Sequence, residues 1–319
     1  MLVNSLLIAS AFMATSIYAW NKDVHQQIGH AAEHLLTPST KSILYQILEP
    51  HYNNSIGLAA AWADDYAHTP KGAFSYQWHW IDSADDAPRY CNVYYHRDCS
   101  AGGCVVSAIA NQTQILKSCI DRVKAGELLN GEDTTCSQAL KWVVHFLGDI
   151  AQPLHASGRK AGGNGIEVVF GNKTTELHAV WDGYIPYADA NVTSFPNTTI
   201  HPFFSNLLSR IHADDFDLPT SEWMACSNPS RALECALNWA RDSNALNCDY
   251  VYAKDIDGVD LATSGYASGA FPIVELQTSK AILRLGTWLN GLVDGQGSHA
   301  QSLVVQTDPS WSMDSDRGE

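Results

Sequence analysis

Two histidine–aspartate pairs in this sequence share the same spacing. His145 precedes Asp149 by four residues in "HFLGDIAQPLH", and His178 precedes Asp182 by four in "ELHAVWD". Residues four apart project from the same face of an α-helix, so each pair would present an imidazole and a carboxylate together. The neighbouring residues are apolar, and burying such polar groups is unfavourable unless a partner satisfies them. A zinc ion would do so, because zinc in proteins accepts imidazole and carboxylate ligands.

Four further residues could join such a site. They are His155, which follows a proline, His79 in "QWHWID", Asp64 in "AWADD" and His25 in "WNKDVH". A single residue of this kind is more often a hydrogen-bonded core histidine or a surface aspartate than a metal ligand. Two pairs of equal spacing beside His155 favour a metal cluster, but the spacing alone leaves both interpretations open.

The composition describes a folded, acidic protein. Of its 319 residues, 45% are hydrophobic and 17% are charged, which is enough for an extensive core and excludes a disordered chain. The formal net charge is -15. A protein that grips long duplex nucleic acid through its phosphates normally presents a basic face. Any phosphate chemistry here must therefore use local cations.

The first nineteen residues are typical of a secretory signal peptide. They are apolar from Leu2 to Met13 and end at Ala19, and the apolar run is short for a membrane anchor. Eight cysteines, an even number, suit a disulfide-bonded extracellular protein. We therefore predict a secreted glycoprotein that is not embedded in a membrane. Its five N-x-S/T sequons are at Asn53, Asn111, Asn172, Asn191 and Asn197.

The elements that must position these residues are mostly helices. Apolar periodicity predicts helices over residues 22–36, 37–48, 56–67, 105–118, 137–151, 201–212, 229–246 and 273–293. Residues 73–103 show no clear period and are predicted to be a long loop. Residues 166–177 should form a hairpin with Asn172 near its exposed tip, followed by a short helix over 178–182.

This pattern predicts an all-α fold with one small β-hairpin. Residues 20–294 would form a single domain. The composition of residues 295–319, which is rich in Gly, Ser, Gln and Asp, predicts a disordered tail.

Several spaced motifs in a fixed order carry a resemblance to a known family. They are "WNKDVH", "WAD", "WHWID", "RDCSAGGC", "HFLGDIAQPLH", "AGGNGI", "LHAVWD" and "LRLGTWLN". With these motifs, the chain from Trp20 to about Leu292 resembles the S1/P1 nucleases, also called class I nucleases, which are related in fold to zinc phospholipase C. The resemblance implies a mostly helical fold that holds three zinc ions in a cleft.

The resemblance also implies which residues bind each ion. The ligands would be Asp64, His79, His145 and Asp149 for the first ion, the α-amine and carbonyl oxygen of Trp20 with His25 and a bridging Asp149 for the second, and His155, His178 and Asp182 for the third. A signal peptidase cut after Ala19 would create the α-amine ligand, so the signal-peptide and metal interpretations support each other.

The activity implied by the resemblance is hydrolysis of single-stranded DNA and RNA to 5′-mononucleotides, together with 3′-nucleotidase activity, by a monomer. A hydroxide activated between zinc ions that Asp64 and Asp149 hold would attack phosphorus. A base would stack on Trp80, Asp82 would bond to its edge, and Asn164 would contact the substrate. The alternative for Trp80 is an ordinary core aromatic.

One position departs from the family pattern. Three residues after Asp64, where the family commonly has Lys or Arg reaching the phosphate, this chain has Ala67, and we expect the adjacent His68 to point elsewhere on a helix. Two alternatives therefore stay open beside the nuclease. One is a zinc phospholipase C, and the other is a secreted zinc-binding protein with weakened catalysis.

The resemblance implies two of the disulfide bonds. Cys99 matches a short family loop with Cys104, and Cys91 matches a long-range bond with Cys248. By exclusion, the remaining bonds would be Cys119–Cys136 and Cys226–Cys235.

Overall fold

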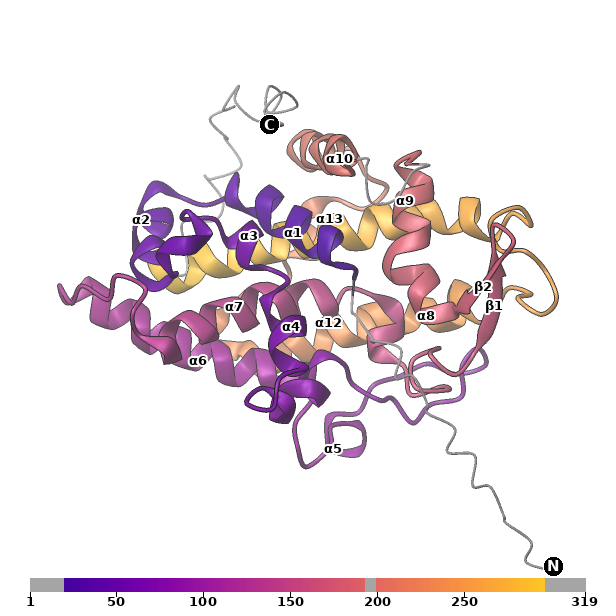
Figure 1. Ribbon diagram of the computed structural model, residues 1–319, viewed down its shortest axis with the longest axis horizontal. Helices are drawn as coiled ribbons and strands as arrows, with labels where there is room; N and C mark the ends of the chain where they lie inside the picture. Colours follow the sequence, from indigo (N-terminus) through magenta and orange to yellow (C-terminus); the bar gives the residue numbers. More distant parts are fainter. Residues whose placement is uncertain (1–19, 193–198, 296–319) are drawn as a thin grey trace, which may run out of the picture.

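The computed structural model describes residues 20–192 and 199–295. The predicted signal peptide, the sequon at Asn197 and all of the predicted tail except Gly295 lie outside the described residues. The described part of the chain is helical apart from one two-stranded antiparallel sheet, as predicted (Figure 1).

The chain forms its elements in the following order. The α-helices are α1 (Lys22–Glu33), α2 (Pro38–Ile47), α3 (Ile56–Ala59), α4 (Trp62–Ala67), α5 (Tyr95–Asp98), α6 (Val105–Lys124), α7 (Thr134–Asp149), α8 (Leu177–Ala179), α9 (Ile185–Asp189), α10 (His201–Ala213), α11 (Thr220–Trp223), α12 (Ala232–Leu246) and α13 (Tyr266–Asp294). The 3₁₀ and π segments are η1 (Pro50–Tyr52), η2 (Ala73–His79), η3 (Pro153–Ala156), η4 (Val180–Tyr184), η5 (Pro229–Arg231) and η6 (Asn247–Val251), and the strands are β1 (Glu167–Phe170) and β2 (Lys173–Glu176).

The long helix α13 forms the axis of the core. It runs lengthwise through the molecule, with α1 and α2 above it and α6 and α7 below it in the view of Figure 1, and it packs against all four. Every residue from 277 to 293 is buried. A helix that is covered on all sides in this way belongs to the interior of the fold.

Helix α7 carries polar side chains into this interior. Its N-terminus is capped by the Asp133 carboxylate, which accepts a hydrogen bond from the Cys136 amide at 3.1 Å. Residues 139–149 are all buried, and the helix ends at Asp149, four residues before Pro153. His145 and Asp149 are therefore held rigidly on the buried face of a regular helix.

Several predicted boundaries differ from the structure. The helix predicted over 56–67 is two helices, α3 and α4, and the carbonyl of Ala60 at the break accepts a hydrogen bond from the His145 ring at 2.7 Å. The loop predicted over 73–103 contains η2 and α5. Helix α13 begins at Tyr266, with Pro272 inside it, rather than after that proline.

The hairpin confirms its prediction. Glu167 pairs with Glu176 and Phe170 with Lys173, and the turn between the strands has Gly171 at φ 59° and Asn172 at φ 63°. Two successive residues with positive φ are typical of a type I′ turn, which favours Gly and Asn. Asn172 is exposed at this tip.

The eight cysteines form four disulfides, and the pairs are those that were predicted. They are Cys91–Cys248, Cys99–Cys104, Cys119–Cys136 and Cys226–Cys235. Within the described residues, no helix is both long and apolar enough to span a bilayer.

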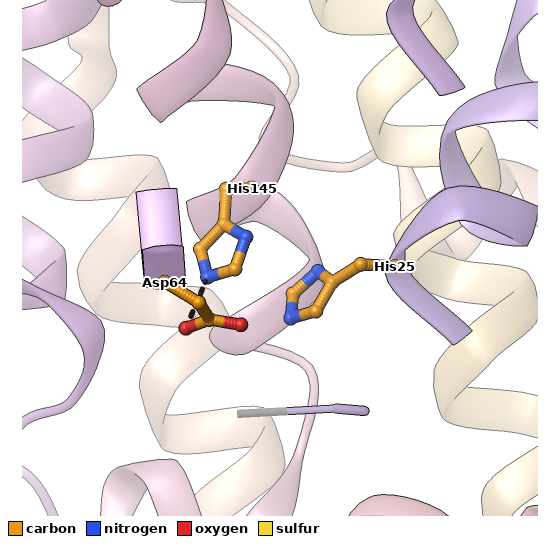
Figure 2. Close-up of side chains that lie close together, drawn as sticks. All are labelled: His25, Asp64 and His145. Carbon is orange, nitrogen blue, oxygen red and sulfur yellow. Dashed lines mark ion pairs between the residues drawn. The ribbon is translucent and has the colours of Figure 1, made fainter. Parts of the chain in front are cut away.

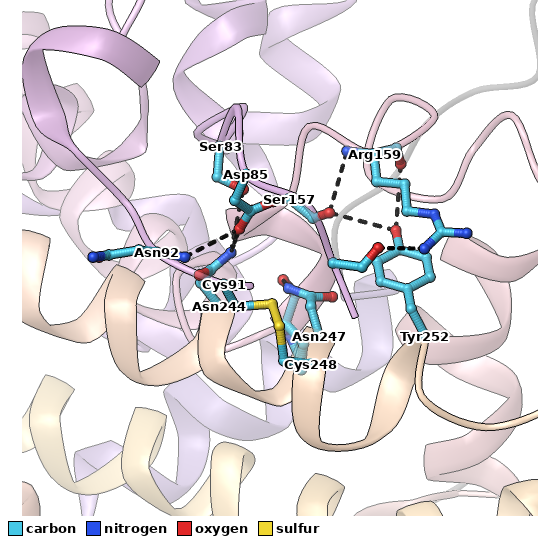
Figure 3. Close-up of a disulfide and its surroundings, with 12 residues drawn as sticks. Ser83, Asp85, Cys91, Asn92, Ser157, Arg159, Asn244, Asn247, Cys248 and Tyr252 are labelled. Atoms are coloured by element: carbon cyan, nitrogen blue, oxygen red, sulfur yellow. Dashed lines mark hydrogen bonds between the residues drawn. A yellow bond between two sulfur atoms is a disulfide. The ribbon is translucent and has the colours of Figure 1, made fainter. Parts of the chain in front are cut away.

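The bond between Cys91 and Cys248 fastens a loop beside η6 (Figure 3). Next to it, the Asn244 amide donates to the Ala156 carbonyl at 2.7 Å and to the Asp85 carboxylate at 2.8 Å. Together these contacts tie the loop before α5 to η3 and α12. They hold in place the segment that follows His79 and Trp80.

Candidate metal centre

Side chains from α1, α4 and α7 converge in the interior. Figure 2 shows His25, Asp64 and His145 pointing toward one another from these three helices. The His145 Nε2 atom lies 3.3 Å from the Asp64 Oδ1 atom, and all three residues are buried. Helices distant in sequence thus bring imidazole and carboxylate groups to one point.

Asp149 occupies the centre of this convergence. Its Oδ1 atom lies 3.2 Å from His25 Nε2. Its Oδ2 atom lies 3.2 Å from His145 Nε2 and 3.1 Å from His79 Nδ1. The two carboxylate oxygens therefore face different histidines, which is the arrangement that a carboxylate bridging two cations requires.

A second group lies next to the first. His178 Nε2 is 3.2 Å from Asp182 Oδ2 and 3.1 Å from His155 Nε2. The side-chain amide of Gln152 donates to Asp182 Oδ1 at 2.7 Å. This leaves Asp182 Oδ2 directed at the histidines, and all of these side chains are buried.

Backbone carbonyls fix the tautomers of three histidines. The Nδ1–H groups of His145, His155 and His178 donate to the carbonyls of residues 60, 79 and 162 at 2.7, 2.8 and 2.6 Å. A neutral ring that donates from Nδ1 carries its lone pair on Nε2. The lone pairs of His155 and His178 therefore face each other, which is unfavourable unless a cation lies between them.

Burial determines which of these groups are charged. Burial, followed by the neighbouring His145, lowers the pKa of His25 to about 4, and burial, followed by His155, lowers the pKa of His178 to about 3. Burial likewise raises the pKa of Asp182 well above its usual range. The two rings are neutral at physiological pH, which is the form that binds metal ions.

Several atoms of the cluster have no hydrogen-bond partner among the described residues. They are His25 Nε2, Asp64 Oδ2, His79 Nε2 and Asp149 Oδ1. Buried polar atoms in proteins are almost always hydrogen-bonded, so a set of orphaned atoms at one point requires an explanation. Together with the opposed lone pairs, these atoms fit a site for metal ions.

The structure forms three groups that could hold an ion. The third group, His155 with His178 and Asp182, has the same members as the third predicted ligand set. The other two groups share His145 and contain five residues predicted for the first two ions. The division of these five between the ions stays a prediction.

The predicted ligand Trp20 is fully buried beside both groups. Its indole N–H donates to the Gly148 carbonyl at 2.9 Å, and the amide of Asn21 donates to the Asp182 carbonyl at 3.0 Å. The backbone of Trp20 is therefore held between the neighbour of Asp149 and Asp182.

A cleft of about 520 Å³ opens above these groups. Its lining includes His79, His155 and the three predicted substrate residues, Trp80, Asp82 and Asn164. The Trp80 indole N–H donates to the Asp82 carboxylate at 3.1 Å. Because Trp80 is half-buried in the wall of a cleft, the core-aromatic interpretation of this residue is wrong.

The structure corrects the expectation for His68. Helix α4 ends at Ala67, and His68, the residue that caps it, lines the same cleft as Ala67 rather than pointing elsewhere. The sequence analysis also overlooked Tyr76 in the cleft wall and Gln152 beside Asp182. Gln152 lies within "HFLGDIAQPLH", between two predicted ligands, and that position was the available signal.

Buried His–Asp groups beneath an aromatic-lined cleft in a helical fold indicate a metal-dependent hydrolase. The family model described as S1/P1 Nuclease matches residues 20–294, and the chain belongs to this family. It is therefore a nuclease by class, a hydrolase that acts on phosphodiester bonds.

Curated relatives agree with the family match. Nuclease S1 of Aspergillus oryzae is 33% identical over 288 residues, which cover 88% of this chain and 94% of the relative. Nuclease P1 of Penicillium citrinum is 33% identical over 280 residues, covering 85% and 97%. Endonuclease 4 of Arabidopsis thaliana is 28% identical over 292 residues, covering 89% and 92%.

Proposed function

We propose that this protein is a zinc-dependent nuclease that cleaves single-stranded DNA and RNA to 5′-mononucleotides and removes the phosphate from 3′-nucleotides. One observation carries the proposal. The buried groups around Asp149 lie directly beneath a cleft whose wall presents Trp80, Asp82 and Asn164. A site for cations that can neutralise a phosphate therefore adjoins a site that can hold a nucleobase.

The zinc ions would be held in three sets. We assign Asp64, His79, His145 and Asp149 to the first ion, Trp20, His25 and Asp149 to the second, and His155, His178 and Asp182 to the third. When bound, zinc supplies positive charge at a phosphate and makes water a stronger nucleophile at neutral pH. The carbonyl-bound histidine rings and Gln152 keep the ligands oriented for this purpose.

The cleft residues would select single strands. Trp80 offers an aromatic surface to a base, and stacking on such a surface is available only to a base that has left its duplex neighbours. Asp82 can accept a hydrogen bond from the edge of that base, and the amide of Asn164 lies in the same cleft. Stacking tolerates every base, so broad base preference follows.

We also propose that the protein is secreted, cleaved after Ala19 and active as a monomer. Four disulfides favour an oxidising compartment, and the sequons at Asn53, Asn111, Asn172 and Asn191 are exposed. Cleavage would turn the buried Trp20 into the N-terminal residue and supply its α-amine as a ligand. A single chain supplies all three His–Asp groups, which supports a monomer.

The weakened zinc-binding protein stays as the second candidate because of one observation. Among the described residues that line the cleft there is no lysine or arginine, and Ala67 occupies the position where the family commonly has one. The family match favours a nuclease over a phospholipase C.

The test is hydrolysis by the purified mature protein. Single-stranded DNA, RNA, 3′-AMP and phosphatidylcholine are incubated with the protein as isolated, after chelation and after zinc is restored. We expect 5′-mononucleotides from the polymers and phosphate from 3′-AMP, with both lost on chelation and regained with zinc. A zinc-loaded protein that binds nucleotides without turnover supports the second candidate, and hydrolysis of the lipid alone supports the phospholipase.

A further inference from the structure

Three aromatic rings form a continuous row along one wall of the cleft. The ring centroids of Tyr76 and Trp80 are 5.1 Å apart with an interplanar angle of 86°, and those of His68 and Tyr76 are 5.7 Å apart at 88°. All three side chains line the cleft. The aromatic surface therefore continues past Trp80, which alone has been given a role in binding a base.

The two ends of the row lie beside different His–Asp groups. After Trp80, the amide of Ile81 donates to the His155 carbonyl at 2.8 Å, so this end adjoins His155 and His178. At the other end, the His68 ring donates from Nδ1 to the Asp64 carbonyl at 2.8 Å. The row thus spans the buried groups from one side to the other.

A single strand that crosses the buried groups must extend along this row. A nucleoside stacked on Trp80 would leave its 3′-phosphate above the His–Asp groups. The next nucleoside would then lie toward the Asp64 end, where Ala67, His68 and Tyr76 line the cleft. The short side chain of Ala67 leaves space there beside the Tyr76 ring.

Tyr76 has the properties of a ligand-binding side chain rather than a core residue. It is half-buried on η2, and its hydroxyl makes no hydrogen bond with another described residue. A tyrosine packed into a protein core usually finds such a partner. Its ring is held between His68 and Trp80, so its orientation is set before any substrate arrives.

We propose that Tyr76, supported by His68, is a second base-stacking subsite, which binds the nucleoside on the 5′-phosphate side of the bond to be cleaved. This inference rests on the proposed nuclease function. It implies that the protein binds substrates with two or more nucleotides more tightly than mononucleotides, because a 3′-mononucleotide has nothing to place on Tyr76.

The experiment compares a dinucleoside monophosphate with 3′-AMP. For Tyr76→Ala, kcat/KM on the dinucleotide should fall about ten- to a hundredfold more than on 3′-AMP, the range found when a stacking residue is removed. The loss should appear in KM. Tyr76→Phe should stay within about threefold of the wild type on both substrates, because the ring is retained.

Two controls separate the possible causes of a loss. Trp80→Ala should impair both substrates, because both place a base on Trp80. Zinc content and the thermal midpoint of Tyr76→Ala should match those of the wild type, which shows that the cluster and the fold are intact.

The failure of this inference differs from the failure of the proposed function. A wild type that hydrolyses neither substrate contradicts the proposed function. A wild type that hydrolyses both, with Tyr76→Ala equally impaired or unimpaired on both, overturns the Tyr76 subsite. A Tyr76→Phe variant as impaired as Tyr76→Ala overturns stacking in favour of a hydroxyl contact. Calorimetric affinities for 3′-AMP and a phosphorothioate dinucleotide repeat the comparison without any need for turnover.

Discussion

Two aspartates show different ways to stabilise a carboxylate away from water. Asp242 on α12 lies 2.8 Å from the Lys280 ammonium and 2.9 Å from the Arg284 guanidinium, both on α13. Asp149 is fully buried, and the printed ion-pair partners around it are histidines alone, of which His25 is neutral. The chain itself supplies the cations for Asp242, whereas Asp149 needs cations from solution. The comparison distinguishes a structural ion pair from a metal site.

The largest effect should come from Asp149→Asn. The substitution keeps the shape of the side chain but removes the charge that faces His25 on one side and His79 and His145 on the other. We expect the zinc content to fall to one ion or fewer and hydrolysis of single-stranded DNA to fall roughly a thousandfold or more. Elemental analysis and a nucleotide-release assay measure the two quantities. A variant that retains full zinc would break the comparison with Asp242.

A smaller but still large effect should follow from one extra residue before Trp20. The α-amine would become an amide nitrogen, whose lone pair is delocalised and binds metal poorly. We expect one zinc ion fewer per chain and a loss of activity of about a hundredfold or more, with the disulfides and fold unchanged. Proteolytic removal of the extra residue should restore both values. An extended protein with full zinc and full activity would show that Trp20 is not a ligand.

The matched change on the structural side is Asp242→Asn. It leaves Lys280 and Arg284, which are 8% and 6% exposed, without their carboxylate. Breaking such a pair is costly, and we expect a loss of about 2–3 kcal/mol in the free energy of unfolding, reduced from the fully buried range because Asp242 is 34% exposed. Zinc content and activity should stay at wild-type values. Loss of zinc from this variant would show that the two sites are not independent.

Much of the fold follows from local patterns. The periodic helices and the Gly171–Asn172 turn were predicted, because each depends on residues that are close in sequence. The break between α3 and α4 could not be predicted, because the Ala60 carbonyl at that break bonds to His145, 85 residues away. The segment η2 was predicted to be a loop, since its aromatic residues face both the core and the cleft and show no single period.

The site was predictable in its chemistry but not in its walls. The spacing of His145 and Asp149 suggested a cluster, and the resemblance supplied the ligand sets. The positions of His68 and Tyr76 depend on where α4 ends and how η2 folds against it, which local sequence does not reveal.

The smallest effect sharpens the comparison with a third carboxylate. Asp189 has neither a chain cation in contact nor a place among the groups that could hold a metal, and its Oδ2 atom is buried without a partner. Burial, followed by the Glu275 carboxylate, raises the pKa of Asp189 to about 7. This carboxyl group therefore stays protonated in the folded protein under mildly acidic conditions.

The sign of the pH dependence follows from the raised pKa. Below about pH 4, Asp189 is protonated in both states and has no effect on stability. Between about pH 4 and 7 only the unfolded state ionises, so the wild type loses stability as the pH rises. Asp189→Asn should therefore raise the thermal midpoint by a few degrees at pH 8 and leave it unchanged at pH 4. Equal shifts at both pH values would contradict the assignment.

The central claim is that the buried groups around Asp149 and Asp182 are a zinc centre. The most direct test is elemental analysis of the mature wild-type protein, secreted into zinc-replete medium and freed of loosely bound metal by gel filtration. The three His–Asp groups predict a ratio close to three zinc ions per chain. A ratio of one or less would contradict the claim, because the opposed lone pairs of His155 and His178 and the orphaned oxygen of Asp149 would then be satisfied in some other way.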